Sequence, residues 1–300
     1  MSPRIFLTSL FDKAVAAADP MQVVPPYLPD RPKGRTVVIA AGKAAAAMAR
    51  AVEDHWVGPL SGIAVTRYGH GVPCEFIDVV EAGHPMPDAA GQNASRLACE
   101  LMAGLTEDDL ALFLISGGGS ALLNAPAAGI TLADKQAVTH ALLTVGAPIS
   151  DINCVRKHLS AVKGGRLAAL AAPARVATLI ISDVPGDDPA TVASGPSIAD
   201  PTTLEDARAV LVKFHISPPD AVAALLNRPE SETPKLVPRA ETHIIATARN
   251  ALDAAAAAAR DAGVQAIILG DDLEGEARAL ARDHAQLVRA HAPALLLSSG

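Results

Sequence analysis

A glycine-rich segment with a serine at each end follows an apolar run at residues 110–115. A glycine backbone can approach an oxyanion closely and adopt φ values that other residues avoid. At the start of a helix, such a segment also directs free N–H groups and a favourable field toward a phosphate or carboxylate. We therefore predict that this segment binds an anion; a turn without a ligand is the alternative. Its members are Ser116, Gly117, Gly118, Gly119 and Ser120.

The sequence lacks both common nucleotide-binding motifs. In the dinucleotide fingerprint a third glycine would stand where this chain has Leu122. In a P-loop, Ser or Thr would follow Lys43, yet Ala44 is found there, and Val37 occupies the place of the first glycine. Any ATP site must therefore be of another kind.

Lys43 is expected at the end of a strand, where a helix begins. A cation is disfavoured at a helix N-terminus. The cost is understandable if Lys43 faces an anion, and we predict that it does. The alternative is a solvated surface lysine.

A basic block at residues 156–166 stands out in an acidic chain. If the block is one helix, Arg156, Ser160 and Lys163 share a face, because they are spaced i, i+4 and i+7. Guanidinium and ammonium groups on such a face would bind a carboxylate or a phosphate. A solvated helix face is the alternative.

Two carboxylates and a serine–glycine pair follow the expected strand at 176–181. Asp183 and Asp187 are candidates for ligating Mg²⁺ or for accepting a proton from an attacking hydroxyl. An ordinary Asp/Pro/Gly turn is the alternative. Ser194 and Gly195 close the same region and would add backbone donors. His84, in the loop 83–88, is a candidate substrate contact, although a lone histidine is more often structural.

Strands and helices alternate along the first two thirds of the chain. Apolar runs predict strands at 36–40, 63–66, 77–80, 110–115 and 176–181, each followed by a polar or glycine-rich loop. This alternation predicts an α/β fold, with a mainly parallel Rossmann-like sheet and helices on both faces. Ligands of such sheets bind beyond the carboxyl ends of the strands, where all these loops gather.

A second set of elements follows a proline-rich connection at 218–238. Strands are expected at 242–246, 266–269 and 294–297, and helices at 250–262 and 274–290. We predict one domain at 1–236 and a smaller α/β domain at 237–300. Because a parallel sheet needs a further helix after its last strand, we expect the second domain to be incomplete in this chain.

Composition narrows the function classes. The chain has 300 residues, half of them hydrophobic, and a net charge of -7 without any Lys/Arg run, so nucleic acid and membranes are not expected partners. An apolar patch at 5–11 predicts an amphipathic helix rather than a signal peptide. The three cysteines form no CxxC pair, which argues against a disulfide framework or zinc site and favours the cytoplasm.

Seven motifs occur in order over about residues 35–200, and together they resemble the type II glycerate kinases, the MOFRL-containing family. They are GKA at 42–44, GHPMP at 83–87, SGGGSA at 116–121, NCVRKHLS at 153–160, KGGR at 163–166, SDVPGD at 182–187 and SGP at 194–196.

This resemblance implies ATP-dependent phosphorylation of D-glycerate at its 2-hydroxyl, with Mg²⁺ as the metal and the active site between two domains. Lys43 would contact the substrate or the transferred phosphoryl group, Arg156 and Mg²⁺ would add positive charge, and Asp183 and Asp187 would serve as base or metal ligands. The family's C-terminal glycine-rich segment and basic residue are expected beyond residue 300. Two alternatives stay open: a hydroxypyruvate reductase using NAD(P)H, and a non-catalytic regulator that binds hydroxy acids. The oligomeric state is also open, with a homodimer as one candidate.

Overall fold

The computed structural model describes residues 2–273, 275–291 and 294–299. All eight expected strands are present, and six of them form one parallel sheet in the order β3-β2-β1-β4-β5-β6. Their bounds are β1 Thr36–Ala41, β2 Leu60–Arg67, β3 Ile77–Ala82, β4 Leu110–Ser116, β5 Arg175–Ile181 and β6 Ala240–Ala246. This is the strand order of a Rossmann-like sheet, so the predicted α/β class is confirmed.

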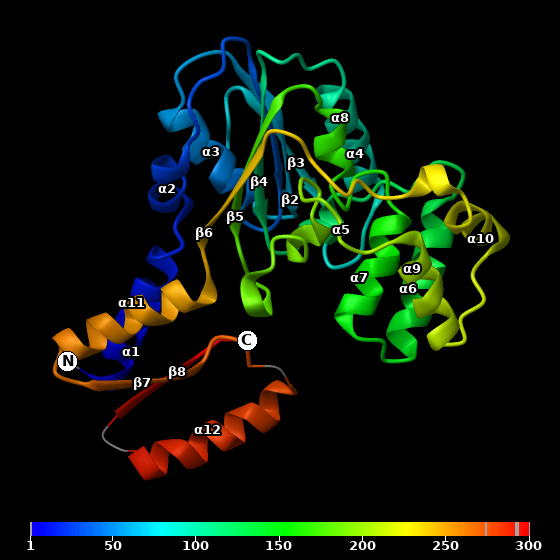
Figure 1. Ribbon diagram of the computed structural model, residues 1–300. Coiled ribbons are helices and arrows are strands. Elements are labelled where there is room, and N and C mark those ends of the chain that lie inside the picture. The colour runs from blue at the N-terminus through cyan, green and yellow to red at the C-terminus, as the bar shows by residue number, and fades with distance from the viewer. Residues whose placement is uncertain (1, 274, 292–293, 300) are drawn as a thin grey trace.

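Helices cover both faces of the sheet (Figure 1). Alternate residues of β1 separate two cores: Val38 packs with α3 (Ala45–His55), whereas Val37 and Ile39 pack on the side of α4 (Ala89–Met102) and α8 (Arg166–Leu170). The short α2 (Pro20–Val23) lies next to α3. Every residue of β1 and β4 is buried, as expected for central strands of a parallel sheet.

A cluster of helices beside the sheet has its own apolar core (Figure 1). It contains α6 (Leu132–Thr144), α7 (Ile149–His158), α9 (Leu204–Lys213) and α10 (Asp220–Leu226). Helices α6 and α9 each begin with a capping box, formed by Thr131 with Asp134 and by Thr203 with Asp206. The four-residue helix α5 (Gly119–Leu122) connects the end of β4 to this cluster.

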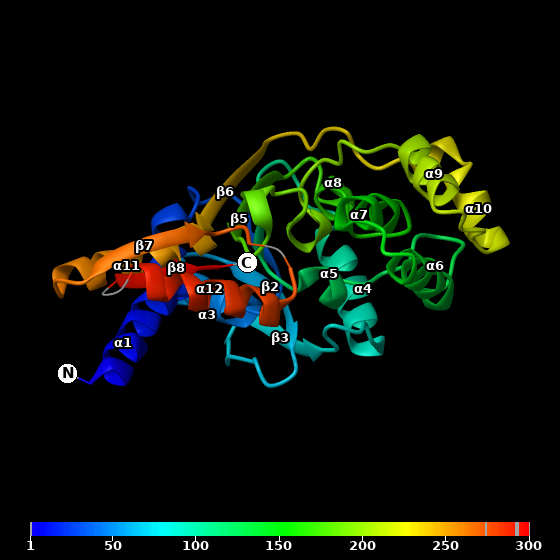
Figure 2. The same cartoon turned by 90° about the horizontal axis from the view of Figure 1, so that it is seen from below.

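The C-terminal elements lie beyond the carboxyl ends of the main strands (Figures 1 and 2). Strands β7 (Gln265–Gly270) and β8 (Ala294–Ser298) pair in parallel, and α12 (Ala277–His291) connects them. Helix α11 (Ala248–Asp261) packs against α1 (Pro3–Ala16), the helix expected from the N-terminal apolar patch.

The boundary expected near residue 237 falls just before β6, and β6 pairs with β5 in the main sheet. The sheet therefore continues across this boundary, and the separate sheet contains β7 and β8 alone among the described strands. The division into two domains stays a prediction. No helix in the described ranges is long and apolar enough to span a bilayer.

Candidate active site

Lys43 and Asp183 meet at the carboxyl edge of the sheet. Lys43 follows β1 and Asp183 follows β5, and β4 lies between these strands. The Lys43 Nζ donates a hydrogen bond to Asp183 Oδ2 over 2.9 Å, and both side chains are about half exposed (44% and 45%). The order of the sheet reverses between β1 and β4, which is where open α/β sheets bind ligands. The two predicted side chains are thus brought together at the expected place.

The glycine loop after β4 fits between these side chains because it has no Cβ atoms. A Cβ on Gly117 would lie 1.7 Å from Asp183 Oδ2, and one on Gly118 would lie 2.9 Å from His84 Nε2. The φ of Gly118 is +87°, a value that favours glycine. The Gly117 carbonyl accepts a hydrogen bond of 2.8 Å from the Lys43 N–H, which fixes the two loops together.

The serines that flank the glycines have different surroundings. Ser116 is buried, and its Oγ accepts a hydrogen bond of 3.1 Å from the Ala44 N–H. It therefore links the β4 loop to the start of α3. The Ser120 hydroxyl is 2.9 Å from the Ser194 hydroxyl, so the predicted sites at Ser120 and Ser194 adjoin one another.

Ser194 and Gly195 lie in a tight left-handed loop. Ala193, Ser194 and Gly195 have φ values of 53°, 61° and 56°, which are uncommon for the two non-glycine residues. The N–H groups of Ser194 and Gly195 donate to the carbonyls of Thr191 and Val192. The expected backbone donors are thus already engaged inside the loop, which leaves the Ser194 hydroxyl as the group that reaches Ser120.

The basic block does not form one helix face, and that prediction is wrong. Helix α7 ends at His158, so Ser160 and Lys163 lie beyond it. Lys163 is 1% exposed, and its Nζ donates to the carbonyls of Ser120 (2.7 Å) and Leu123 (3.0 Å). Burial, with Lys135 and Arg156 nearby, holds the Lys163 pKa well below its usual value. Lys163 thus holds the end of the glycine loop in place through hydrogen bonds to backbone carbonyls.

Arg156 instead lines a cavity of about 230 Å³ next to the glycine loop. Burial lowers the pKa of its guanidinium. Polar side chains on the cavity wall also include Lys135 of α6 and Asn124, which the sequence did not single out. The remaining wall is formed by Pro85, Met86, Pro87, Ser120, Leu132, Gln136, Thr139, His140 and Leu143.

A second cavity, of about 280 Å³, opens on the other side of Asp183. Its wall includes Asp183 and Pro185 after β5, Thr247 at the start of α11, and Asp271 and Ser299 beside the β7–β8 sheet. Asp183 therefore faces a space between the main sheet and the C-terminal elements.

The loop 182–189 offers carboxylates of different character. Asp183 is exposed, with one oxygen bonded to Lys43. Asp187 has a φ of 52°, and its N–H donates to the Val184 carbonyl. The Asp188 carboxylate accepts hydrogen bonds from the Ala190 N–H and the Thr191 hydroxyl.

Mg²⁺ is usually held by one or two carboxylates together with phosphate oxygens and water, and the carboxylates of the loop 182–189 suit that donor set. Within the described residues, no cluster of three or more His, Cys, Asp or Glu side chains suits a metal.

His84 borders the glycine loop at Gly118. Burial, together with the positive charges of Lys43 and Arg67, lowers its pKa. A neutral imidazole can accept or donate one hydrogen bond at the mouth of the site.

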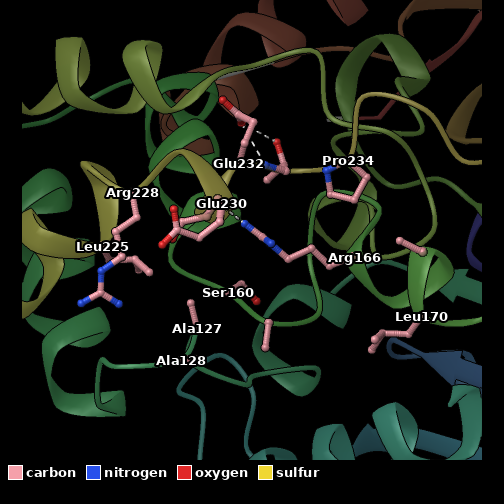
Figure 3. Close-up of a pocket in the computed structure, with 14 residues that line it drawn as sticks. Ala127, Ala128, Ser160, Arg166, Leu170, Leu225, Arg228, Glu230, Glu232 and Pro234 are labelled. Atoms are coloured by element: carbon pink, nitrogen blue, oxygen red, sulfur yellow. Dashed lines mark hydrogen bonds between the residues drawn. The ribbon is translucent and has the colours of Figure 1, made fainter.

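A further pocket, of about 590 Å³, is lined by residues of α8, of α10 and of the segment that follows α10 (Figure 3). Arg166, Arg228, Glu230 and Glu232 contribute to its wall, and Arg166 donates to the Ser231 carbonyl. Its positive and negative side chains balance, and Lys43 and Asp183 are not among its lining residues.

Comparison with known proteins identifies the family. The model of a family described as "Domain of unknown function (DUF4147)" matches residues 6–227. The chain belongs to this family. A putative hydroxypyruvate reductase from Agrobacterium vitis is 52% identical over all of this chain and 70% of the relative, and a D-glycerate 2-kinase from Thermotoga maritima is 40% identical over 92% of this chain and 66% of the relative. The crystal structure of a Thermotoga maritima glycerate kinase superposes with a TM-score of 0.87 at 37% identity, covering 98% of this chain and 73% of that one.

The predicted resemblance to glycerate kinases is thereby confirmed for this DUF4147 member. The roles of the individual site residues stay predictions.

Proposed function

We propose that this chain forms the substrate-binding part of an enzyme that phosphorylates D-glycerate at its 2-hydroxyl, with ATP as the phosphoryl donor. The observation that supports it most is the Lys43–Asp183 pair beside the glycine loop, at the carboxyl edge of the sheet. The relatives named as glycerate 2-kinases agree with this chemistry.

Phosphoryl transfer requires alignment of the reactants and neutralisation of negative charge more than covalent participation of the protein. The glycerate 2-hydroxyl oxygen would bond to the γ-phosphorus while the bond from that phosphorus to the β–γ bridging oxygen breaks. The hydroxyl proton would pass to the carboxylate of Asp183. Lys43 carries the positive charge that balances the phosphoryl oxygens, with Arg156 as a second cation.

ATP and Mg²⁺ would occupy the side of Asp183 that faces the second cavity. Asp183 and Asp187 are the carboxylates available to Mg²⁺, which when bound neutralises phosphate charge. The substrate is a small molecule, and we place the reaction in the cytoplasm, where three cysteines that form no disulfide would remain reduced.

Reduction of hydroxypyruvate is the second candidate, because relatives with that name are 52% and 49% identical to this chain. A nicotinamide cofactor would be expected to bind through the glycine fingerprint after β1. The turn after β1 contains Gly42 and Lys43 followed by an alanine-rich helix. This turn favours the kinase.

The deciding experiment incubates the full-length protein with D-glycerate, ATP and Mg²⁺ and identifies the product by ³¹P NMR. We expect 2-phosphoglycerate. Formation of 3-phosphoglycerate would contradict the proposed regiochemistry. NADH oxidation with hydroxypyruvate, without phosphorylated product, would establish the reductase, and glycerate binding without any turnover would establish a regulator.

A further inference from the structure

Two cationic side chains share the cavity beside the glycine loop without a carboxylate partner. Lys135 of α6 is 5% exposed, and Arg156 of α7 lines the same cavity. Within the described part of the chain, neither forms an ion pair. Burial lowers the pKa of both. Because buried charges without a counterion are costly, their proximity indicates a place for an anion.

Asn124 lines the same cavity and contains a buried donor without a partner among the described residues. It is 2% exposed, and its Oδ1 accepts a hydrogen bond of 2.9 Å from Lys135 Nζ. This bond fixes the orientation of the amide. Its Nδ2 group has no hydrogen-bond partner among the described residues. A buried amide NH₂ without an acceptor is uncommon, and it is satisfied if a ligand oxygen binds there.

The cavity adjoins the glycine loop of the reaction centre proposed above. Ser120 lines it, and this residue ends the glycine loop that touches Asp183 and His84 through Gly117 and Gly118. The pocket at the helix cluster differs, because Glu230 and Glu232 accompany its arginines (Figure 3).

The rest of the wall restricts the size of the ligand. Pro85, Met86, Pro87, Leu132 and Leu143 form its apolar part, beside the polar Ser120, Gln136, Thr139 and His140, and the cavity measures about 230 Å³. An anionic group of a few atoms fits this volume, while a large polar molecule would bury groups that the apolar side chains cannot pair.

We propose that Lys135, Arg156 and the Asn124 amide form a subsite for the carboxylate of a small 2-hydroxy acid. This assignment rests on the proposed kinase function and names the residues that select its substrate. A carboxylate held there leaves the hydroxyl end of the molecule to face the glycine loop and the Lys43–Asp183 pair. Lys135 and Asn124 thus become substrate-binding residues.

Isothermal titration of the full-length protein tests the subsite with D-glycerate, with glycerol as the analogue that lacks a carboxylate, and with inorganic phosphate. Lys135→Met should weaken D-glycerate binding by about 10- to 100-fold, the effect of losing a charge-assisted hydrogen bond. Binding of glycerol should not change. The control is Lys33→Met, since Lys33 is an exposed lysine that is not among the cavity's lining residues, and this variant should bind as the wild type does.

Asn124→Asp is the second variant, because it keeps the shape of the side chain and places a carboxylate beside Lys135, whose Nζ already donates to the Asn124 Oδ1. It removes the free donor and repels an anion, so D-glycerate binding should fall at least tenfold. Wild-type D-glycerate affinity in Asn124→Asp would overturn the subsite while leaving the kinase function intact. Weakened phosphate binding with unchanged D-glycerate binding would overturn the carboxylate assignment. A wild-type protein that binds no D-glycerate would overturn the proposed function and the subsite together.

Discussion

The Lys43 Nζ lies 2.9 Å from Asp183 Oδ2, although 140 positions separate the two residues in the chain. Both side chains are about half exposed. Exposed ion pairs of this kind contribute about 0–1 kcal/mol to stability. The pair is therefore better explained by the reaction than by the fold, and its two members can be tested by separate changes.

Replacing Lys43 with alanine should lower kcat by about 10²–10³-fold, corresponding to roughly 3–4 kcal/mol of lost electrostatic stabilisation of the transition state. The free energy of unfolding should change by less than about 1 kcal/mol, because the ion pair is exposed. Steady-state kinetics and urea unfolding measure the two quantities. A variant with a normal rate would remove Lys43 from the mechanism.

Gly117→Ala should lower kcat with little effect on the fold. The new Cβ would lie 1.7 Å from Asp183 Oδ2, so the carboxylate must leave its present position beside Lys43. The matched control is Gly71→Ala, whose Cβ would meet only the flexible end of Glu81, at 3.1 Å. We expect at least a tenfold lower kcat for Gly117→Ala and wild-type kcat for the control, since a misplacement of about 1 Å can cost about 100-fold. Equal kcat values for the two variants would show that the reaction does not require the Asp183 carboxylate at its position beside Lys43.

The buried ion pair between Lys157 of α7 and Asp200 should contribute strongly to the free energy of unfolding. Lys157 and Asp200 form an ion pair of 3.3 Å with side chains 7% and 0% exposed, and Asp200 also accepts hydrogen bonds from Thr202 and Thr233. Asp200→Asn keeps the shape but leaves the Lys157 charge buried and unpaired, which should cost about 3–5 kcal/mol in urea unfolding. The control Asp151→Asn breaks a pair with the exposed Lys213 and should cost less than about 1 kcal/mol. Similar values for both variants would contradict the role assigned to burial.

The sequence predicted the sheet and the gathering of the loops that contain Lys43 and Asp183, because parallel strands bring their carboxyl ends to one edge. The ion pair between the two residues was not predicted. The sequence also did not predict Lys135, since a lysine in a helix is expected at the surface. A signal was nevertheless present: Lys135, Val138 and Leu142 are spaced i, i+3 and i+7, and all three are buried. A lysine on the apolar stripe of a helix therefore indicates a buried charge that needs a partner.

The basic block at residues 156–166 shows where prediction from local spacing fails. Spacing placed Ser160 and Lys163 on the helix of Arg156, but helix α7 ends at His158. After this end the chain turns, so that Lys163 reaches the carbonyls of Ser120 and Leu123. Such contacts between distant segments have no local sequence signal, which is why the supporting role of Lys163 was missed.

Binding of D-glycerate should depend on pH through Lys135. Burial and the nearby Arg156 lower the Lys135 pKa to about 7, so the free protein loses this proton above pH 7. Its other cationic or titratable neighbours are Lys163 below the loop and His140 on the cavity wall, and Asn124 is its hydrogen-bond partner. A bound carboxylate favours the charged ammonium and raises this pKa, so binding takes up a proton.

The affinity for D-glycerate should therefore fall as the pH rises above 7, by up to about tenfold per pH unit while the free form is neutral and the bound form is charged. Titration calorimetry at pH 8 in two buffers of different ionisation enthalpy measures the proton uptake directly. Lys135→Met should abolish the uptake attributable to this group, whereas Lys33→Met should retain it. Because the charge on Arg156 persists throughout this range, an affinity independent of pH would show that Lys135 is not in contact with the carboxylate.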